Sequence, residues 1–233
     1  MSIAVILPAA GSSSRFAAAR NKLVQTLAGK PVIAHSLALF LSRSDVKQVI
    51  IAAGDDSDVA REEHASWQVL LQDPRVKRVP GGQTRAHSVL AALQAVDESI
   101  EWVAVHDAAR PLVTQAIIDA TLKLARQHGA AVPALPVALT IKMAAGPLPA
   151  PVQSTLPRHL LWAMQTPQII RRADLLRAFR DCPIPLQEVT DDVQLIELAG
   201  GQVWLTPGDE RNLKITTHQD LILAEMLMTE ELK

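Results

Sequence analysis

The chain is predicted to fold as an α/β protein with a Rossmann-like, mostly parallel sheet flanked by helices. Short apolar segments rich in Val, Ile and Ala alternate with longer segments that have the periodicity of amphipathic helices. The chain has 233 residues, of which 48% are hydrophobic, enough to bury a large core. Repeated strand–helix–strand units favour a parallel sheet covered on both faces. We expect residues 1–233 to form one domain.

Five strands and four helices are expected before residue 137. The strands are Ile3–Leu7, Gln48–Ala53, Val76–Pro80, Trp102–His106 and Ala131–Pro136. The helices between them are Ile33–Leu41, Asp58–Leu71, Arg85–Val96 and Gln115–Gln127. Ligands of such sheets bind beyond the carboxyl ends of the parallel strands. Polar residues that follow a strand are therefore the candidate site residues.

The pattern changes after Pro136. Residues 137–158 contain short extended pieces around the proline-rich stretch AAGPLPAP, which cannot be helical. We expect a two-stranded β-arm that leaves the body and turns near Gly146–Pro151. An isolated hairpin has little stability in water, so we expect a partner chain to cover the arm and the arm to serve dimerisation. A surface loop is the alternative.

The remaining elements are shorter. Helices are expected at Ala173–Arg180 and Asp192–Leu198, followed by a strand at Gln202–Thr206. A last helix is expected over about Thr217–Glu231, with Thr217 as its cap.

Composition excludes several classes of function. The net charge is −1 and aromatic content is 3%, so the chain has neither a basic field nor many stacking platforms for nucleic acid. The single cysteine, Cys182, excludes an internal disulfide and a Cys-rich metal site, and the histidines lack zinc-site spacing. No apolar segment approaches the ~20 residues that span a bilayer. With no basic leader at the N-terminus, we expect a cytoplasmic protein without a membrane partner.

The loop after the first strand is the strongest candidate site. The stretch IAVILPAAGSSSRF ends an apolar strand in Pro8, Ala9, Ala10 and Gly11, followed by three serines. Small side chains let backbone N–H groups approach an anion, and Arg15 and Lys22 add positive charge nearby. The loop is typical of a triphosphate site, although an ordinary strand-to-helix turn is the alternative. The three glycines of a dinucleotide fingerprint and a Walker A motif are both absent.

Two further strand ends carry polar motifs. In GGQTRAHSV, glycines 81 and 82 let the backbone approach a ligand, while Arg85 and Ser88 share one helical face. This segment could read the edge of a base, or be a glycine turn beside a solvated arginine. In VHDAARP, Asp107 could bind a metal ion or polyol hydroxyls, or cap the next segment. His106 is expected to be structural.

Two more cationic residues, Arg158 and Lys214, lie beside positions where we expect the strands to separate and leave room for a ligand. A single surface cation is usually solvated. Their significance comes from the other cations predicted at the same edge.

Together these motifs resemble the 2-C-methyl-D-erythritol 4-phosphate cytidylyltransferase family of nucleotidyltransferases. The resemblance runs from Ile3 to about Leu227 and is carried, in the family's order, by PAAGSSSRF, GKPVIAHSL, GGQTRAHSV, VHDAARP, LWAMQTPQ, TDD and NLKIT. Each motif alone is weak evidence for the family, whereas all of them together in this order are specific for it. Four positions depart from the family pattern: Asn21 replaces a usual proline, Leu23 a usual glutamine, Gln83 a usual acidic residue and Leu139 a usual aspartate.

The resemblance implies that CTP and methylerythritol phosphate are the substrates, with Mg²⁺ held mainly through the CTP phosphates. It assigns the backbone of Pro8, Ala9, Ala10 and Gly11 to the nucleotide, with Gly82, Gln83, Arg85 and Ser88 around the cytosine. Arg15 and Lys22 would stabilise the α-phosphate. Asp107, Thr140 and Thr166 would bind the polyol, and Arg158 and Lys214 its phosphate.

In the family the arm crosses to a second subunit, which implies a homodimer whose shared sites use Thr140 and Arg158 of the neighbour. Three alternatives stay open at this point. They are a cytidylyltransferase for another polyol phosphate such as ribitol 5-phosphate, a non-catalytic nucleotide-binding protein, and a structural dimerisation module.

Overall fold

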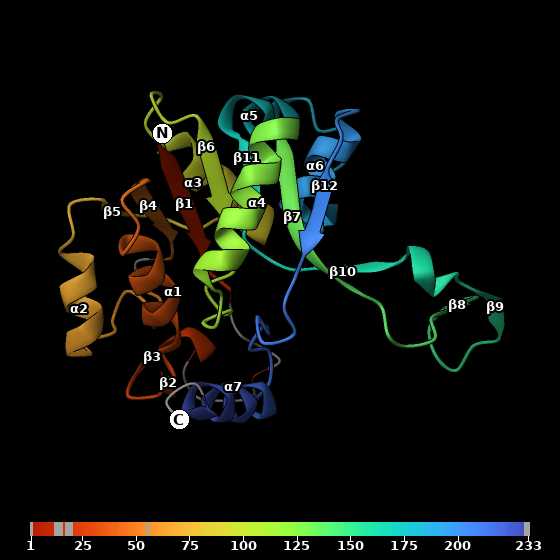
Figure 1. Cartoon of the computed structure of the whole chain (residues 1–233), viewed down its shortest axis with the longest axis horizontal. Helices are drawn as coiled ribbons and strands as arrows, with labels where there is room; N and C mark the ends of the chain where they lie inside the picture. Colours follow the sequence, from red (N-terminus) through yellow and green to blue (C-terminus); the bar gives the residue numbers. More distant parts are fainter. Residues whose placement is uncertain (1, 12–15, 17–20, 55, 231–233) are drawn as a thin grey trace.

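The computed structural model describes residues 2–11, 16, 21–54 and 56–230 (Figure 1). The described part contains an eight-stranded sheet with the strand order β10-β7-β11-β6-β1-β4-β5, in which β12 pairs with β7. The strands are β1 (Ile3–Pro8), β4 (Val46–Ala52), β5 (Val76–Val79), β6 (Trp102–Val105), β7 (Ala130–Pro136), β10 (Trp162–Met164), β11 (Gln168–Arg171) and β12 (Trp204–Pro207). A separate small hairpin pairs β2 (Thr26–Leu27) with β3 (Lys30–Pro31).

The sheet is mostly parallel, as predicted. The pairs β1–β4, β1–β6, β4–β5 and β7–β12 are parallel, whereas β11 runs antiparallel to β6 and β7, and β10 antiparallel to β7. These two antiparallel strands were not predicted. They have only three and four residues, too few for a period of two to stand out from the sequence.

Helices cover both faces of the sheet, because the strands bury both sets of alternating side chains. Ile3, Val5 and Leu7 of β1 belong to one core, while Ala4 and Ile6 belong to the other. The first core is covered by α1 (Val32–Leu41), α2 (Ala65–Leu71), α4 (Gln115–His128) and α7 (His218–Glu230). The second is covered by α3 (Arg85–Gln94), α5 (Arg172–Arg180) and α6 (Asp192–Leu198), and Figure 1 shows α4 and α3 on opposite faces.

One predicted helix is shorter than expected. The structure starts α2 at Ala65, and not at Asp58, with His64 as its N-cap. In the preceding segment the Ser57 hydroxyl accepts a hydrogen bond from Ala60 N, which favours isolated turns over a continuous helix. The Asp58 carboxylate meanwhile accepts a hydrogen bond from Asn21 N. The prediction was based on the spacing of apolar residues, which does not report the side-chain hydrogen bonds that compete with a helix here.

The last helix has the predicted cap. Thr217 Oγ1 accepts a hydrogen bond from Asp220 N at 3.3 Å, and Asp220 Oδ2 accepts one from Thr217 N at 2.7 Å. This reciprocal arrangement is a capping box.

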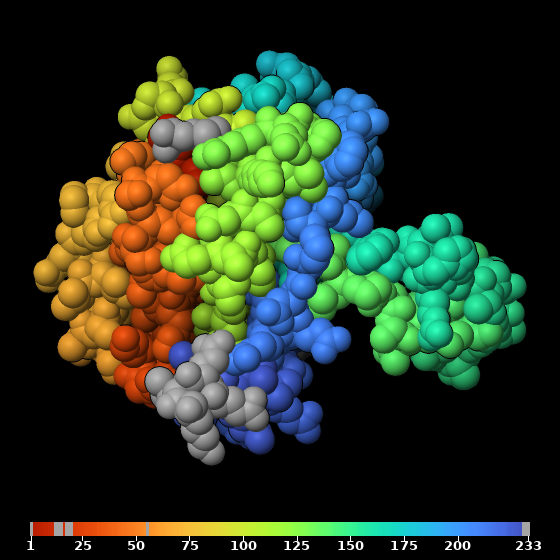
Figure 2. Space-filling view, viewed as in Figure 1, coloured from red at the N-terminus to blue at the C-terminus, as the bar shows by residue number. Residues whose placement is uncertain are grey.

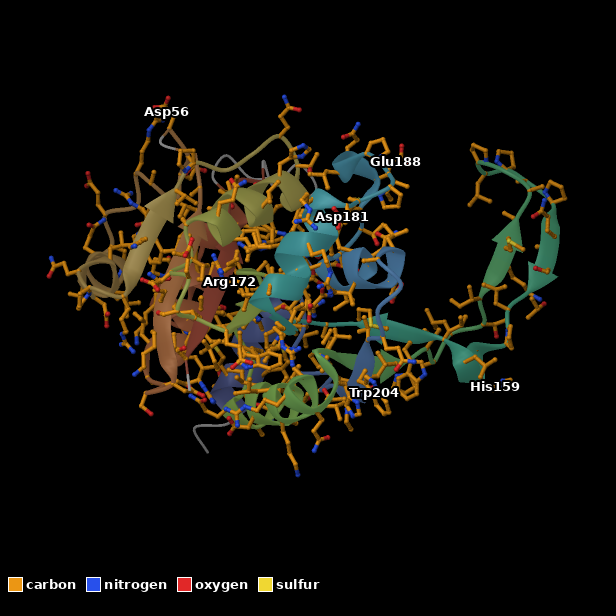
Figure 3. All side chains as sticks on the ribbon, turned by 90° about the horizontal axis from the view of Figure 1, so that it is seen from above. Asp56, His159, Arg172, Asp181, Glu188 and Trp204 are labelled. Atoms are coloured by element: carbon orange, nitrogen blue, oxygen red, sulfur yellow. The ribbon has the colours of Figure 1, made fainter. Side chains whose placement is uncertain are left out.

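The predicted arm is a two-stranded hairpin that projects from the body (Figures 1 and 2). Its strands are β8 (Lys142–Ala144) and β9 (Val152–Thr155), and Leu148 between them is 84% exposed. Seen from above, the labelled His159 also lies away from the body (Figure 3). Dimerisation through this arm and the single-domain boundaries stay predictions.

Candidate active site

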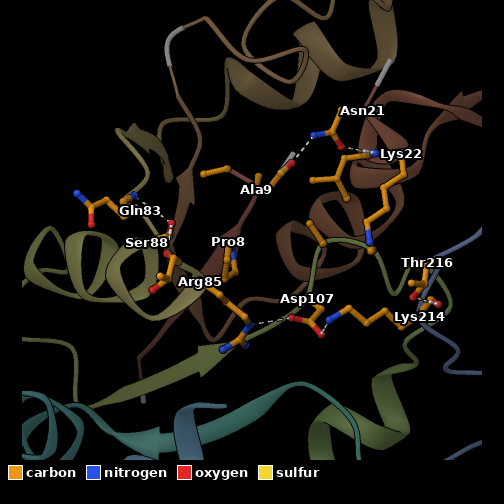
Figure 4. A pocket seen from close by; sticks show the side chains of 17 residues that line it. Pro8, Ala9, Asn21, Lys22, Gln83, Arg85, Ser88, Asp107, Lys214 and Thr216 are labelled. Atoms are coloured by element: carbon orange, nitrogen blue, oxygen red, sulfur yellow. Dashed lines mark hydrogen bonds and ion pairs between the residues drawn. The ribbon is translucent and has the colours of Figure 1, made fainter. Parts of the chain in front are cut away.

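A cavity of about 510 Å³ opens where β1 and β6 end and α3 begins (Figure 4). The register places it there: Ile6 of β1 pairs with Val105 of β6, so Pro8 and Asp107 emerge at the same level of the sheet. The predicted site residues that line the cavity are Pro8, Ala9, Ala10, Gly11, Lys22, Gly82, Gln83, Arg85, Ser88, Asp107 and Lys214. Arg15 lies outside the described residues.

The loop after β1 is fixed at both of its described ends. Ala9 N donates to Ala52 O at 2.8 Å, which prolongs the pairing of β1 with β4. Asn21 Nδ2 donates to Gly11 O at 2.8 Å, while Asn21 Oδ1 accepts a hydrogen bond from Leu23 N at 3.0 Å. Asn21, at the family's usual proline position, therefore links Gly11 to the short helical turn that carries Lys22.

The glycine loop after β5 approaches the β1 loop closely. A Cβ atom on Gly81 would lie 2.2 Å from Ala10 Cβ, and one on Gly82 would lie 2.3 Å from His87 Cβ. Neither position has room for a side chain. Ser88 Oγ accepts a hydrogen bond from Gly82 N at 3.0 Å and donates to Thr84 O at 3.0 Å. Ser88 thus holds the loop at the N-terminus of α3.

Asp107 is the centre of a cluster of cations. Its Oδ1 lies 3.2 Å from Arg85 Nε, and its Oδ2 lies 2.8 Å from Lys214 Nζ and 3.7 Å from Arg110 Nε. Burial alone would raise the pKa of Asp107, but Arg85 and Lys214 outweigh it and hold this pKa far below its usual range. The carboxylate is therefore ionised at neutral pH, and it directs the half-exposed ammonium of Lys214 along the cavity wall (Figure 4).

Thr166, in contact with His106, holds the backbone of Asp107 in place. Thr166 Oγ1 accepts a hydrogen bond from Asp107 N at 3.0 Å and lies 3.0 Å from His106 Nδ1. Burial lowers the pKa of His106 to about 4, so this ring is neutral at pH 7 and structural, as expected. Thr166 is 3% exposed and does not line the cavity, because its hydroxyl is engaged in these two contacts. Its role in binding a polyol stays a prediction.

The two predicted arm residues lie outside this cavity. Thr140 is exposed, and Arg158 Nη1 donates to Ala138 O at 2.8 Å within the base of the arm. The arm with β8 and β9 projects away from the body (Figure 1), and neither residue lines the cavity. The chain therefore does not bring them to its own site in this conformation.

The structure adds residues that the sequence prediction did not select. Arg110 pairs with Asp107 and donates from Nη1 to Asn212 O at 2.7 Å, which ties the Lys214 segment to the end of β6. Asp192 forms an ion pair with Arg85 at 2.8 Å. Arg110 stood in the VHDAARP motif and Asp192 in TDD, so their motifs were the available signal.

Among the described residues, no group of three or more His, Cys, Asp or Glu side chains could hold a metal ion. Asp107 is the one carboxylate among the described lining residues, and its oxygens face cations. No described helix is both long and apolar enough to cross a membrane.

A small-residue loop, a tight glycine turn and lysines from two segments line one cavity at the strand ends, an arrangement suited to binding the phosphates of a nucleotide. The comparisons with known proteins agree. The model of the 2-C-methyl-D-erythritol 4-phosphate cytidylyltransferase family matches residues 3–230, and the chain belongs to this family. It is accordingly a cytidylyltransferase, as the sequence predicted.

The individual relatives cover nearly the whole chain. A cytidylyltransferase of this name from Bacillus velezensis is 41% identical over 236 residues, covering 99% of this chain and 97% of the relative. A bifunctional IspD/IspF enzyme from Desulfotalea psychrophila is 40% identical over 98% of this chain, which spans 57% of that longer protein. The crystal structure of the Thermus thermophilus cytidylyltransferase is similar with a TM-score of 0.77 and 31% identity, covering 98% of this chain and 100% of the other.

Proposed function

We propose that the chain transfers CMP from CTP to 2-C-methyl-D-erythritol 4-phosphate, giving 4-diphosphocytidyl-2-C-methyl-D-erythritol and pyrophosphate. The observation that carries the proposal is one cavity lined by two backbone loops and by lysines from two different segments, Lys22 and Lys214. An oxygen of the acceptor phosphate attacks the α-phosphorus of CTP. A new P–O bond forms at the α-phosphorus as the bond between this atom and the α,β-bridging oxygen breaks. Pyrophosphate leaves with the electron pair of the broken bond.

The nucleotide side of the cavity is built from backbone. Residues 8–11 present small side chains at the end of β1, so N–H groups there can approach phosphate oxygens. Gly82 and Gln83, in the adjoining loop that Ser88 holds, would bind the cytosine edge. Lys22, which also lines the cavity, would neutralise charge on the α-phosphate.

The acceptor side is built around Asp107. Lys214 has three N–H donors, one of which faces Asp107, so the others are left to bind the acceptor phosphate. The phosphate is already an anion, and so the reaction needs positioning and neutralisation of charge more than a general base. The carboxylate has further lone pairs for polyol hydroxyls.

Mg²⁺ would be bound mainly by phosphate oxygens of CTP and by water. The described residues offer no cluster of ligands for it, and Mg²⁺ ordinarily keeps several waters and binds through substrate phosphates. When bound, the ion would supply further neutralisation of the triphosphate charge.

The direct test is pyrophosphate release by the purified chain with CTP. We expect release with methylerythritol 4-phosphate, none with ribitol 5-phosphate, and loss of activity when EDTA removes Mg²⁺. Release with ribitol 5-phosphate alone would change the acceptor. CTP binding without release from either acceptor would indicate a binding protein.

We further propose that the arm completes the site of a second copy with Thr140 and Arg158, in a homodimer. The support is that both residues lie on an exposed arm, away from their own cavity. Mixtures of inactive Arg15→Ala and Arg158→Ala chains are expected to regain activity, since one of the two sites in each mixed dimer would be intact. Lack of recovery, when mass spectrometry shows subunit exchange, would contradict sharing.

A further inference from the structure

A partly buried ion pair leads from the cavity to the N-terminus of α6. Arg85 reaches across the cavity floor, with its Nε 3.2 Å from Asp107 Oδ1 and its Nη2 2.8 Å from Asp192 Oδ2. The Asp192 side chain is 1% exposed and does not line the cavity. Asp192 therefore has no direct access to a substrate, yet it shares Arg85 with the carboxylate at the centre of the site.

Asp192 is held firmly in place. Gln168 of β11 is also 1% exposed, and its Oε1 accepts hydrogen bonds from Asp192 N at 2.9 Å and Val193 N at 3.0 Å. Gln168 Nε2 donates to Asp191 Oδ2 at 3.0 Å. These three bonds fasten the start of α6 to a central strand of the sheet. The Asp192 carboxylate is thus a fixed anchor for the long side chain of Arg85.

Charge explains why this anchor matters. Arg85, Arg110 and Lys214 are three cations that share two carboxylates, Asp107 and Asp192. His106 is neutral and adds no charge. Without Asp192, all three cations would depend on Asp107 alone. Arg85 would then compete with Lys214 for that carboxylate, because a guanidinium can bind both of its oxygens at once.

The electrostatics agree with this geometry. Burial alone would lower the pKa of Arg85, but Asp192 and Asp107 outweigh it and raise this pKa. Burial raises the pKa of Asp192, and Arg85 offsets part of that rise. Each group thus favours the charged form of the other.

We propose that Asp192 is a positioning residue of the transfer reaction. It holds Arg85 on Oδ1 of Asp107 and so leaves Oδ2 to orient Lys214 toward the acceptor phosphate. This inference rests on the proposed function, in which Lys214 binds that phosphate. It assigns a role to the TDD motif, which the described cavity does not use directly.

The first experiment compares Asp192→Asn with Asp191→Asn. Asp191 Oδ1 caps α6 by accepting a hydrogen bond from Gln194 N at 3.0 Å, and the described structure gives it no ion pair with Arg85. Both variants remove one carboxylate charge from the start of α6, but only the first removes the charge that holds Arg85. We expect Asp192→Asn to raise KM for the polyol phosphate about tenfold, the effect of one misplaced charged hydrogen bond, with KM for CTP within about twofold. Asp191→Asn removes the Gln168 Nε2 contact but keeps the two bonds from Gln168 Oε1 to the backbone of Asp192 and Val193, so it should change either KM by less than about twofold. Equal kinetics in the two variants would overturn the proposal.

The second experiment asks whether Asp192 acts through Arg85. In an Arg85→Gln background, adding Asp192→Asn should leave KM for the acceptor unchanged within about twofold, because the residue through which it acts is gone. Effects that multiply would show an independent, structural role and overturn the proposal. The double variant also removes both buried charges, so it stays informative if Asp192→Asn alone does not fold. Pyrophosphate release by the unchanged chain is measured first, and its absence would reject the proposed function and not this inference alone.

Discussion

Lys22→Ala is expected to lower kcat about 10²–10³-fold, the usual effect of removing one preorganised donor from a developing charge. Lys22 is the first residue of the turn that Asn21 caps, and its side chain lines the same cavity as Lys214 (Figure 4). Its charge would act where the α-phosphate is attacked, so the effect should fall on kcat more than on KM for either substrate. Steady-state kinetics with CTP varied at saturating acceptor measures this.

The matched control is Lys47→Ala. Lys47 is exposed, near the amino end of β4, and donates to Ser44 O at 2.9 Å, far along the sheet from the cavity. Both variants should keep the free energy of unfolding within about 0.5 kcal/mol of the unchanged chain. A kcat for Lys22→Ala equal to that of Lys47→Ala would remove Lys22 from the mechanism.

Asp107→Asn is expected to lower kcat/KM by at least about 100-fold and to destabilise the fold by about 3 kcal/mol. The substitution leaves Arg85, Arg110 and Lys214 around an uncharged amide, and breaking a buried ion pair on one side leaves cations without compensation. Chemical denaturation and steady-state kinetics give the two values. Asp181→Asn, which removes an exposed ion pair with Arg180 on the outer surface, should change neither (Figure 3).

The stability effect of Asp107 should also depend on pH in a defined direction. The pKa of Asp107 is lower in the folded chain than its value of about 3.9 in an unfolded chain. Its contribution is therefore complete above about pH 4 and decreases as the pH falls below that value. The difference in stability between the unchanged chain and Asp107→Asn should shrink from pH 5 to about pH 3. A constant difference across this range would show that the carboxylate charge is not what stabilises the cluster.

Most of the fold could be predicted because it depends on local pattern. Apolar runs such as Ile3–Leu7 and amphipathic segments such as Gln115–Gln127 have the period of their structure, and parallel order follows from their alternation. The antiparallel β11 could not be predicted in this way. Its Ile169 and Ile170 pair with residues about 40 and 65 positions away, and no local period reports such pairing.

The candidate site, like the fold, could be predicted only in part from the sequence. The sequence placed Pro8 to Gly11, Gly82, Asp107 and Lys214 at strand ends, and these residues line one cavity. It assigned Asp107 to substrate hydroxyls, but could not show that its carboxylate already holds Arg85, Arg110 and Lys214. It also raised Asn21 only as a departure from the family pattern, whereas the structure shows its side chain joining Gly11 to Leu23.

The sequence by itself determined the α/β class, the loops at the strand ends, the projecting arm and the family, because each of these depends on residue type and short-range spacing. Only the tertiary structure decided which charged side chains form ion pairs with one another. Arg85, Asp107, Asp192 and Lys214 come from four segments, and their ion pairs form only when the sheet brings the ends of β5 and β6 beside α6 and the residues before α7. Electrostatic interactions are strong only over a few ångströms in a partly buried site, so the balance of charge there is a property of the fold.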